Sequence, residues 1–507
     1  MVSNDGLGAL HLESDLSKGI IAWNGQNDTH NPRNFSPAKK WTTMILLSGM
    51  IALRFVIFFR RTSITRRLRG FCQSFLTSTI VSPAASRITS EFHVGDPILS
   101  SLITTIYVLA YMFGPLILSP LSELYGRRLI LNSANAVFTL SHIGCALAPN
   151  AGTFLAFRIT SGLGGSVSLS VGGGIVPDLF DVHERGVPNA LVTTGSLFGP
   201  VLGPLFGGLI TQGAGWRWIF WVLLIACAVV SIAMAAFAPE TNALVIIRHK
   251  TLKLRKETDR QELQSAYDSE KSSASLNNPW LLLARAISRP WKMLFHSPLL
   301  VILCIMVGLI SGLLYTLLTT TSTFFQEFYE WPLGTAGLAY MGLGLGSLIG
   351  LIVFAKTSDL LTVRLTKANN DIFQPEMRIV TAFLPALFIP VSFFWYGWST
   401  QAQTHWIVPL VGLVPFGFAQ VGINATAQAY LIDASGSFAA SSVACVTSVR
   451  CLFGAFLPLA GPSLYDHLGL GWGNSLLGFI SLVMPVMTII IYRFGQKLRE
   501  RYPLHTE

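Results

Sequence analysis

Residues 195–208 read Gly-Ser-Leu-Phe-Gly-Pro-Val-Leu-Gly-Pro-Leu-Phe-Gly-Gly, and this stretch decides the expected fold. Glycine recurs at every fourth position inside an apolar run, at Gly195, Gly199, Gly203 and Gly207. On a helix this spacing leaves one face without side chains, so that the backbone of a neighbouring helix can approach closely. Pro200 adds a bend, which membrane helices tolerate where neighbouring helices satisfy the freed carbonyl groups. The stretch predicts a membrane helix that packs through glycine.

A second stretch, residues 114–128, reads Gly-Pro-Leu-Ile-Leu-Ser-Pro-Leu-Ser-Glu-Leu-Tyr-Gly-Arg-Arg. It ends an apolar helix with a carboxylate and a Gly-Arg-Arg turn, which suits a short loop at a membrane surface. At these residues the chain resembles the major facilitator superfamily, and within it the fungal twelve-span drug:proton antiporters. Residues 114–128 are similar to that family's loop motif between spans 2 and 3, and residues 195–208 to the span 5 motif of its exporters. The resemblance implies an all-α polytopic membrane protein of two six-helix bundles.

Composition supports the same class independently. Of the 507 residues, 51% are hydrophobic and 12% are charged, whereas a soluble protein carries about 25% charged residues. The net charge of +10 does not indicate a nucleic-acid partner. Its Lys and Arg residues cluster on alternate loops between apolar runs, as the positive-inside rule expects. The six cysteines show neither metal-ligand spacing nor a disulfide framework, so no metal site is expected.

About twelve apolar runs approach the roughly 20 residues that a spanning helix needs. They predict a cytoplasmic N-terminal tail and two six-helix bundles that flank a polar linker. The expected ranges are the N-terminal tail (1–40), the first bundle (41–237), the cytoplasmic linker (238–297), the second bundle (298–492) and the cytoplasmic C-terminal tail (493–507). The bases of both tails, of the linker and of the 2–3 and 8–9 loops fall on one side, which predicts cytoplasmic termini.

Residues 51–70 interrupt the first expected span. They carry six arginines, whose burial at a bilayer centre costs at least about 2.5 kcal/mol each: Arg54, Arg60, Arg61, Arg66, Arg67 and Arg69. Removing residues 51–70 joins residues 41–50 to 71–81 and leaves one uncharged apolar segment of 21 residues. We interpret this anomalous basic insertion as a retained intron. A real insertion that forms a basic cytoplasmic excursion is the alternative, and it would damage span 1.

Acidic and basic residues at the cytoplasmic ends of spans are the candidates for a conformational latch. The resemblance implies this role for the loop motif and the acid that ends span 4. The candidates are Glu123, Arg127, Arg128 and Asp178, with Asp359 and Asp433 in the second half, where Arg364 follows Asp359. A charge-assisted network there would hold one conformation of the transporter. The alternative is a solvated ion pair worth about 0–1 kcal/mol.

Arg158 lies early in span 4, in a sequence similar to the family's Arg-x-x-x-Gly motif. A charge inside a span is costly and usually faces the bundle interior. The resemblance implies a part in proton coupling. The alternative is that Arg158 snorkels to the outer interface, since it lies only about five residues inside the span.

Polar and aromatic residues within otherwise apolar spans are the candidates for the substrate cavity: Tyr107, Tyr340, Gln420, Asn424, Gln428 and Arg450. Gln420, Asn424 and Gln428 are four residues apart, so they share one face of a helix. Such a stripe should face protein or water rather than lipid. An interhelical hydrogen-bond seam would give the same pattern.

The expected function is proton-coupled efflux of a small amphiphilic organic compound, such as a toxin, drug or secondary metabolite, at the plasma membrane of a fungus. The glycine pattern of residues 195–208 resembles exporters rather than sugar importers. An uptake permease or facilitator is the alternative within transport, and a non-transporting membrane sensor of the same fold is the alternative outside it. We expect a small-molecule substrate and the lipid bilayer as partners, no nucleic acid, a monomer, and no cofactor beyond the proton gradient. No nucleophile–base or metal constellation indicates an enzyme.

Overall fold

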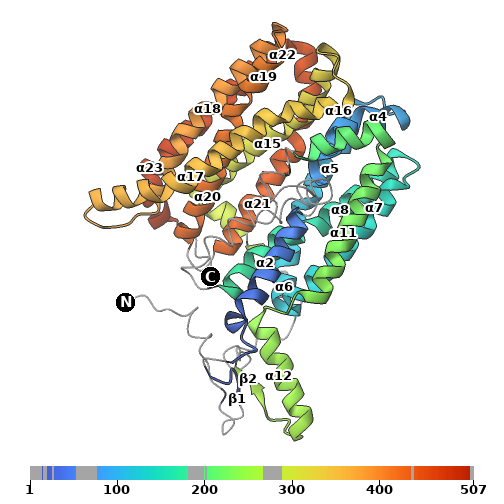
Figure 1. The fold of residues 1–507 in the computed structure, drawn as a ribbon. Coiled ribbons are helices and arrows are strands. Elements are labelled where there is room, and N and C mark those ends of the chain that lie inside the picture. The colour runs from blue at the N-terminus through green and yellow to red at the C-terminus, as the bar shows by residue number, and fades with distance from the viewer. Residues whose placement is uncertain are drawn as a thin grey trace.

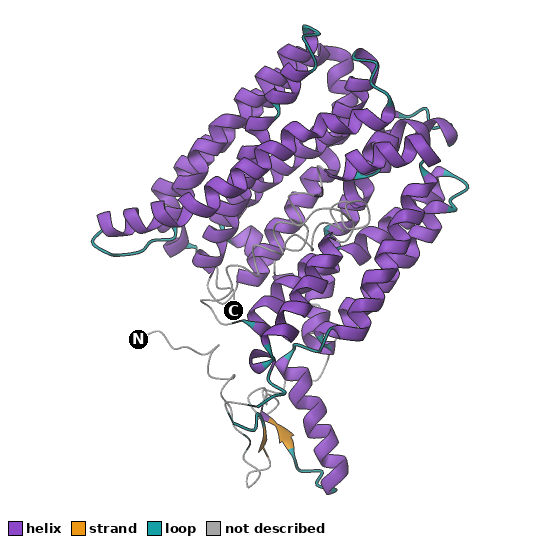
Figure 2. Cartoon of the chain, viewed as in Figure 1, coloured by secondary structure: helices purple, strands orange, loops and turns teal. Residues whose placement is uncertain are grey.

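The protein is described by a computed structural model that covers residues 14, 20–25, 28–52, 77–180, 199, 202–266, 288–289, 291–435 and 439–502. Helices dominate these ranges, and the two short strands are the exception (Figure 2). The elements up to the linker are β1 (Ile20–Ile21), η2 (Pro32–Asn34), α2 (Pro37–Ala52), η4 (Ser82–Ala84), α4 (Ala85–Glu91), α5 (Pro97–Tyr111), α6 (Phe113–Tyr125), α7 (Arg127–Ala146), α8 (Ala151–Gly165), α9 (Val167–Leu179), α11 (Arg217–Phe237), α12 (Ala243–Thr258) and β2 (Gln264–Ser265). Residues 202–214 are also helical.

The second half is built in the same way. Its elements are α15 (Pro298–Phe328), α16 (Leu333–Ala336), η6 (Gly337–Tyr340), α17 (Met341–Ala368), α18 (Glu376–Gln401), α19 (Ile407–Gly412), α20 (Val414–Ser435), α21 (Ala439–Phe456), η8 (Leu457–Ala460), α22 (Gly461–Ser481) and α23 (Val483–Arg501). Capping side chains set several helix starts. Asn150 accepts a hydrogen bond from the Thr153 amide at 2.8 Å, and Ser297 caps α15 before Pro298.

Nine helical stretches within the described ranges are long and apolar enough to cross a membrane. The last stretch, Ser441–Arg501, is 61 residues long and contains a reversal. Tyr465 donates a hydrogen bond to Asn474 at 3.1 Å, although nine residues of straight helix would separate them by about 14 Å. Gly469, with φ of 70°, turns the chain between them. The stretch therefore holds two antiparallel spans.

The helices form two groups that meet along α5, α15 and α21. Figure 1 shows the blue and green elements of the first half on one side and the yellow to red elements on the other. One hydrophobic cluster joins the groups, since it includes Tyr107 and Val108 of α5, Leu313 and Tyr315 of α15, and Cys451 of α21. The interior of the protein is thus continuous between its two halves.

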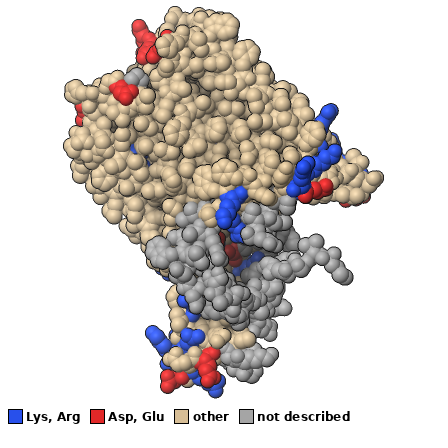
Figure 3. Space-filling model, turned by 180° about the vertical axis from the view of Figure 1, so that it is seen from behind, with Lys and Arg blue, Asp and Glu red and all other residues tan. Residues whose placement is uncertain are grey.

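Most exposed charged side chains lie away from the middle of the molecule. In Figure 3 most blue and red residues lie near the top, at the right-hand edge and in the lower part of the view, and a broad tan surface lies between them. Large apolar side chains such as Ile232, Phe237 and Leu140 are exposed on the outside of the protein. An apolar band of this kind is expected where lipid tails surround a protein.

The segment before the first helix folds against the segment that follows the first half. Ile20 and Ile21 of β1 pair in parallel with Gln264 and Ser265 of β2, and Figure 1 places both strands beside α12. Lys250 of α12 donates to the carbonyl oxygen of Ala22 at 2.8 Å. The sequence had indicated only polar segments here, so this pairing is a tertiary feature.

The predicted insertion, residues 51–70, lies almost entirely outside the described residues. Ile51 and Ala52 complete α2, and the description resumes at residue 77. The retained-intron interpretation therefore stays a prediction, as do the expected bounds of the tails, bundles and linker.

Candidate functional site

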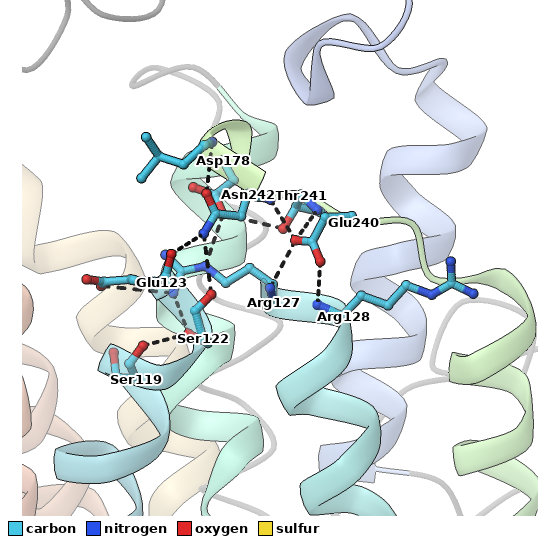
Figure 4. A network of polar contacts seen from close by, with 10 residues as sticks. Ser119, Ser122, Glu123, Arg127, Arg128, Asp178, Glu240, Thr241 and Asn242 are labelled. Carbon is cyan, nitrogen blue, oxygen red and sulfur yellow. Dashed lines mark hydrogen bonds and ion pairs between the residues drawn. The ribbon is translucent and has the colours of Figure 1, made fainter. Parts of the chain in front are cut away.

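Arg127 lies at the centre of a polar network at the ends of α6, α7 and α9 (Figure 4). Gly126, with φ of 103°, makes the turn between α6 and α7, so that Arg127 begins a helix. The Arg127 Nε donates to Asp178 Oδ2 at 3.3 Å, and its Nη1 donates to Ser122 Oγ at 2.6 Å. The guanidinium group thereby joins the ends of three helices.

Glu240 completes the network from the segment after α11. Its carboxylate accepts hydrogen bonds from the backbone amides of Arg127 at 2.9 Å and Arg128 at 3.0 Å. These amides are the first two of α7, where the unpaired N–H groups and the helix dipole favour an anion. A side chain at Gly126 would displace the Glu240 carboxylate, because its Cβ would lie 2.6 Å from Glu240 Oε2.

The next two residues bind the same helix ends. Thr241 donates to Asp178 Oδ2 at 3.4 Å. Asn242 caps α12 and donates through Nδ2 to the carbonyl oxygen of Glu123 at 2.9 Å. Residues 240–242 were not predicted as site residues. The sequence did carry a signal that could have found them. An acidic, a hydroxyl and an amide side chain follow an apolar run directly, at the membrane surface where that run ends.

Asp178 lies just beyond Val176, where the spanning stretch ends. Burial raises the pKa of the Asp178 carboxyl to about 6, against the opposing effects of Arg127 and Thr241. The carboxyl group therefore titrates close to physiological pH. Its ionised form pairs with Arg127, and its protonated form loses that attraction.

Glu123 and Arg128 contribute less than the sequence suggested. The Glu123 carboxylate is 4.0 Å from Arg127 Nη1, and its side chain is 58% exposed, so the pair is worth at most about 1 kcal/mol. The Arg128 side chain points away from Asp178 in Figure 4 and donates to the carbonyl oxygen of Ala235. Arg128 enters the network through its backbone amide. We call Ser122, Glu123, Arg127, the backbone amide of Arg128, Asp178 and residues 240–242 the Arg127 network.

The second half has its own ion pairs at the corresponding helix ends. Asp433 of α20 pairs with Arg378 of α18, while Arg364 is exposed on α17. Asp433 therefore contacts Arg378, a base that the sequence analysis did not single out, and the part of Asp433 in a latch stays a prediction. Asp359 lies on α17, and its side chain is outside the described residues.

A further acid of the second half was not predicted. Glu376 is almost fully buried at the start of α18. Arg499 of α23 donates to Glu376 Oε1 at 3.3 Å and Tyr430 of α20 donates to it at 3.4 Å. This contact holds the ends of three helices of the second half together, as Arg127 does in the first.

Arg158 is buried inside the first half with 0% of its surface exposed. Its Nη1 donates to the carbonyl oxygen of Thr77 at 3.1 Å and its Nη2 to that of Thr104 at 3.5 Å. The guanidinium carbon lies 4.9 Å from the centre of the Tyr107 ring. A snorkelling arginine would expose its guanidinium group, so this burial argues against the snorkelling alternative.

The glycine face of span 5 packs on the first half, and the adjacent Pro204 approaches the second half. A Cβ at Gly207 would lie 1.9 Å from the carbonyl oxygen of Ile80, and a Cβ at Gly337 would lie 2.6 Å from that of Pro204. Gly203 is buried, and Gly199 accepts a hydrogen bond from Thr79 at 3.1 Å. Gly195 and Pro200 lie outside the described residues. Where it is described, the face lies close to a neighbouring backbone, and its role in export stays a prediction.

The predicted cavity residues do not form one cluster. Tyr340 is fully buried and donates to the carbonyl oxygen of Leu318 at 2.8 Å within the second half. Tyr107 lies against Arg158 in the first half. Arg450 is half-buried on α21, the second-half helix that packs on α5.

The polar stripe occupies one face of α20. Gln420 and Asn424 are half-buried and Gln428 is exposed. The Asn424 Nδ2 donates to the carbonyl oxygen of Gln420 at 2.8 Å, within the same helix. Thr426 of α20 hydrogen-bonds to Thr381 of α18, so the face of α20 that carries Thr426 packs on α18. Helical geometry places the polar stripe on a different face of α20.

The model of the Major Facilitator Superfamily matches residues 70–458. The chain belongs to the major facilitator superfamily. It is 40% identical over 488 residues to "MFS transporter prlG" of a fungal species, and this match covers 96% of the chain and 97% of the relative. It is 36% identical over 488 residues to "Efflux pump radE" of Floropilus chiversii, covering 96% of the chain and 86% of the relative.

Solved structures show the same fold. The D-xylose-proton symporter superposes with a TM-score of 0.63 at 15% identity, covering 89% of this chain and 97% of that chain. The human organic anion transporter MFSD10 superposes with a TM-score of 0.56 at 16% identity, covering 90% and 100%. These comparisons confirm the all-α major facilitator fold. The protein is a multi-pass membrane transporter of small molecules and not an enzyme.

Proposed function

We propose that this transporter exports a small amphiphilic organic compound from the cytosol of a fungus in exchange for protons. A toxin, drug or secondary metabolite made by the same organism is the proposed cargo. The observation that carries the proposal is the glycine face of span 5, which resembles that of exporters and packs backbone against backbone. The relative named as an efflux pump adds support from similarity.

Glycine packing gives the halves a contact that can open and close. Span 5 lies against Ile80 of the first half and approaches Gly337 of the second. Ser78 and Tyr315 add a hydrogen bond of 3.3 Å between the halves near this contact. Because Gly207 and Gly337 carry no side chain at these two contacts, the backbones approach closely there and can separate without repacking a core.

The Arg127 network would control the opposite end. Its hydrogen bonds tie α6, α7 and α9 to the segment after α11, so these helix ends move as one body. The Asp178 carboxyl, whose pKa burial raises to about 6, makes the network sensitive to protons. Arg158 adds the fixed positive charge that we propose for proton coupling.

We propose the plasma membrane as the location, cytoplasmic termini and a monomeric protein. The bases at the α17–α18 turn and on α23 support this orientation by the positive-inside rule.

Deletion of the gene tests the export proposal even while the cargo is unidentified. Compounds in medium and mycelium are compared by mass spectrometry before and after deletion. Export predicts a compound that is retained in the deletion strain and released again by the wild-type transporter, with release abolished by a protonophore. A compound that instead fails to enter the deletion strain would indicate uptake. A strain with an unchanged distribution of compounds would favour the sensor alternative.

A further inference from the structure

Within the described spans, buried positive charge lies apart from the carboxylates. The chain has 25 Asp and Glu residues, and those within the candidate spans lie toward span ends, such as Glu123, Glu327 and Asp433. Asp359 lies 26 residues after Leu333, or about 39 Å along the helix, beyond a hydrocarbon layer of about 30 Å. Arg158 and Arg450, by contrast, lie seven and nine residues after the starts of their spanning stretches at Ala151 and Ser441.

Arg158 has no acidic partner within the described part of the chain. Its hydrogen bonds to Thr77 and Thr104 end on carbonyl oxygens, and its Nε is buried without a hydrogen bond to a described residue. A guanidinium group normally gains its strongest contacts from a carboxylate in bidentate geometry. Carbonyl oxygens and one aromatic ring compensate the buried charge only in part.

Arg450 brings a second positive charge to the same region from the second half. Thr77 contacts Arg158, and Ser78 is the next residue in the chain. The Ser78 hydroxyl forms a hydrogen bond of 3.3 Å with the Tyr315 hydroxyl. The Tyr315 ring in turn packs on Gly454, one helical turn after Arg450, where a Cβ would lie 2.9 Å from the ring. Tyr315 therefore lies between the two arginines.

Helix α5 gives the axial separation between the contact of Arg158 and a contact made close to Arg450 in the chain. Arg158 contacts the carbonyl oxygen of Thr104, and Ser448, two residues before Arg450, contacts that of Met112 at 3.2 Å. Eight residues of helix correspond to about 12 Å. Tyr107 and Tyr111 lie along this length with ring centres 6.1 Å apart. The region combines two cationic groups with aromatic rings.

We propose that the transported compound is an amphiphilic organic anion, whose carboxylate or enolate group pairs with Arg158 while its apolar body lies against the tyrosines. This inference rests on the proposed transport of a small molecule and adds its charge class. A cationic compound would meet two like charges, and a neutral one would leave the buried Arg158 charge without a counter-ion. The acid would supply the counter-ion that the described part of the protein lacks at this position.

Binding to the purified full-length transporter tests the charge class separately from transport. Two acids serve as probes, 1-naphthylacetate and 1-pyrenebutyrate. Each acid is compared with its primary amide and its amine analogue, which keep the same carbon skeleton. Thermal unfolding is followed at neutral pH over a range of probe concentrations. We expect the acids to raise the unfolding midpoint at concentrations at least about tenfold below those of the amides, and the amines to have no effect.

Variants locate the binding. Arg158→Gln should abolish the preference for acids, Arg158→Lys should retain part of it, and Arg450→Gln should weaken it. The last two keep the test valid if Arg158→Gln fails to fold. Lys253→Gln is the matched control, because Lys253 is 78% exposed on α12. Stabilisation by amides or amines equal to that by acids, or none by the acids, would overturn the proposal. Acid binding without export would refute only the transport function.

Discussion

The Glu240 carboxylate accepts a hydrogen bond of 2.9 Å from the backbone amide of Arg127, 113 positions earlier in the chain. This contact places a negative charge at the start of α7 and fixes the end of α11 beside α6 and α9. The Arg127 side chain uses the same position to bind Asp178. Arg127 of the loop motif therefore binds one acid through its backbone amide and another acid through its side chain.

Replacing Glu240 should loosen the whole Arg127 network. Glu240→Gln removes the charge at the helix start and should destabilise this end of the first half by about 1–3 kcal/mol, with a marked fall in export. Hydrogen exchange of residues 120–130 and resistance assays measure the two effects. Glu257→Gln, at a position that is 55% exposed on α12, serves as the control. Normal exchange and export in Glu240→Gln would remove this residue from the mechanism.

Arg127→Ala should reduce export strongly while the protein still reaches the membrane, because it disconnects α6, α7 and α9. Glu123→Gln should have a smaller effect, since its contact with Arg127 is 4.0 Å long and largely exposed. Export relative to surface abundance measures both. Equal effects of the two variants would contradict the ranking that these contacts imply.

Asp178 should make stability depend on pH in the acidic range. Its pKa of about 6 in the folded protein exceeds the ordinary value of 3.8. Between these two pH values the folded state holds a proton that the unfolded chain has lost. The stability that this proton contributes is complete below pH 3.8 and disappears as the pH rises through about 6. Asp178→Asn should flatten the thermal stability profile across this window. An unchanged profile would show that other groups control it.

Gly207→Ala should damage transport although alanine is small. The added Cβ would lie 1.9 Å from the carbonyl oxygen of Ile80, so span 5 must move away from its neighbour. Gly213→Ala in the same helix is the control, because a Cβ there meets nothing within 4 Å. Gly203→Leu should likewise abolish export. Full activity of both Gly207→Ala and Gly203→Leu would show that this face carries no packing role.

The basic insertion predicts a specific transcript. If residues 51–70 are a retained intron, the mature message should join Met50 to the neighbourhood of Phe71. The shortened protein should insert and export, while the longer form should do so poorly because its arginines oppose membrane insertion. Sequencing of cDNA across this region decides between them. A transcript that always retains the insertion, with equal activity of both forms, would refute the intron interpretation.

The sequence by itself determined the membrane class, the order of the apolar runs and the glycine face of span 5. These properties depend on local composition and on helical spacing, which a single segment carries within itself. The burial of Gly203 and the close approach of Gly207 to Ile80 follow from that spacing. Arg127 and Asp178 could be proposed as members of one network because the loop motif contains Arg127 and Asp178 is the acid that ends span 4.

Only the tertiary structure decided which distant groups meet. Asp433 pairs with Arg378 rather than with Arg364, and Glu240 binds amides that no residue pattern marks as its partners. The snorkelling and buried arrangements of Arg158 are also compatible with one sequence, and they differ only in what surrounds the guanidinium group. The physical reason is that burial and pairing depend on how helices separated by many residues are placed side by side, and that placement is a property of the folded chain as a whole.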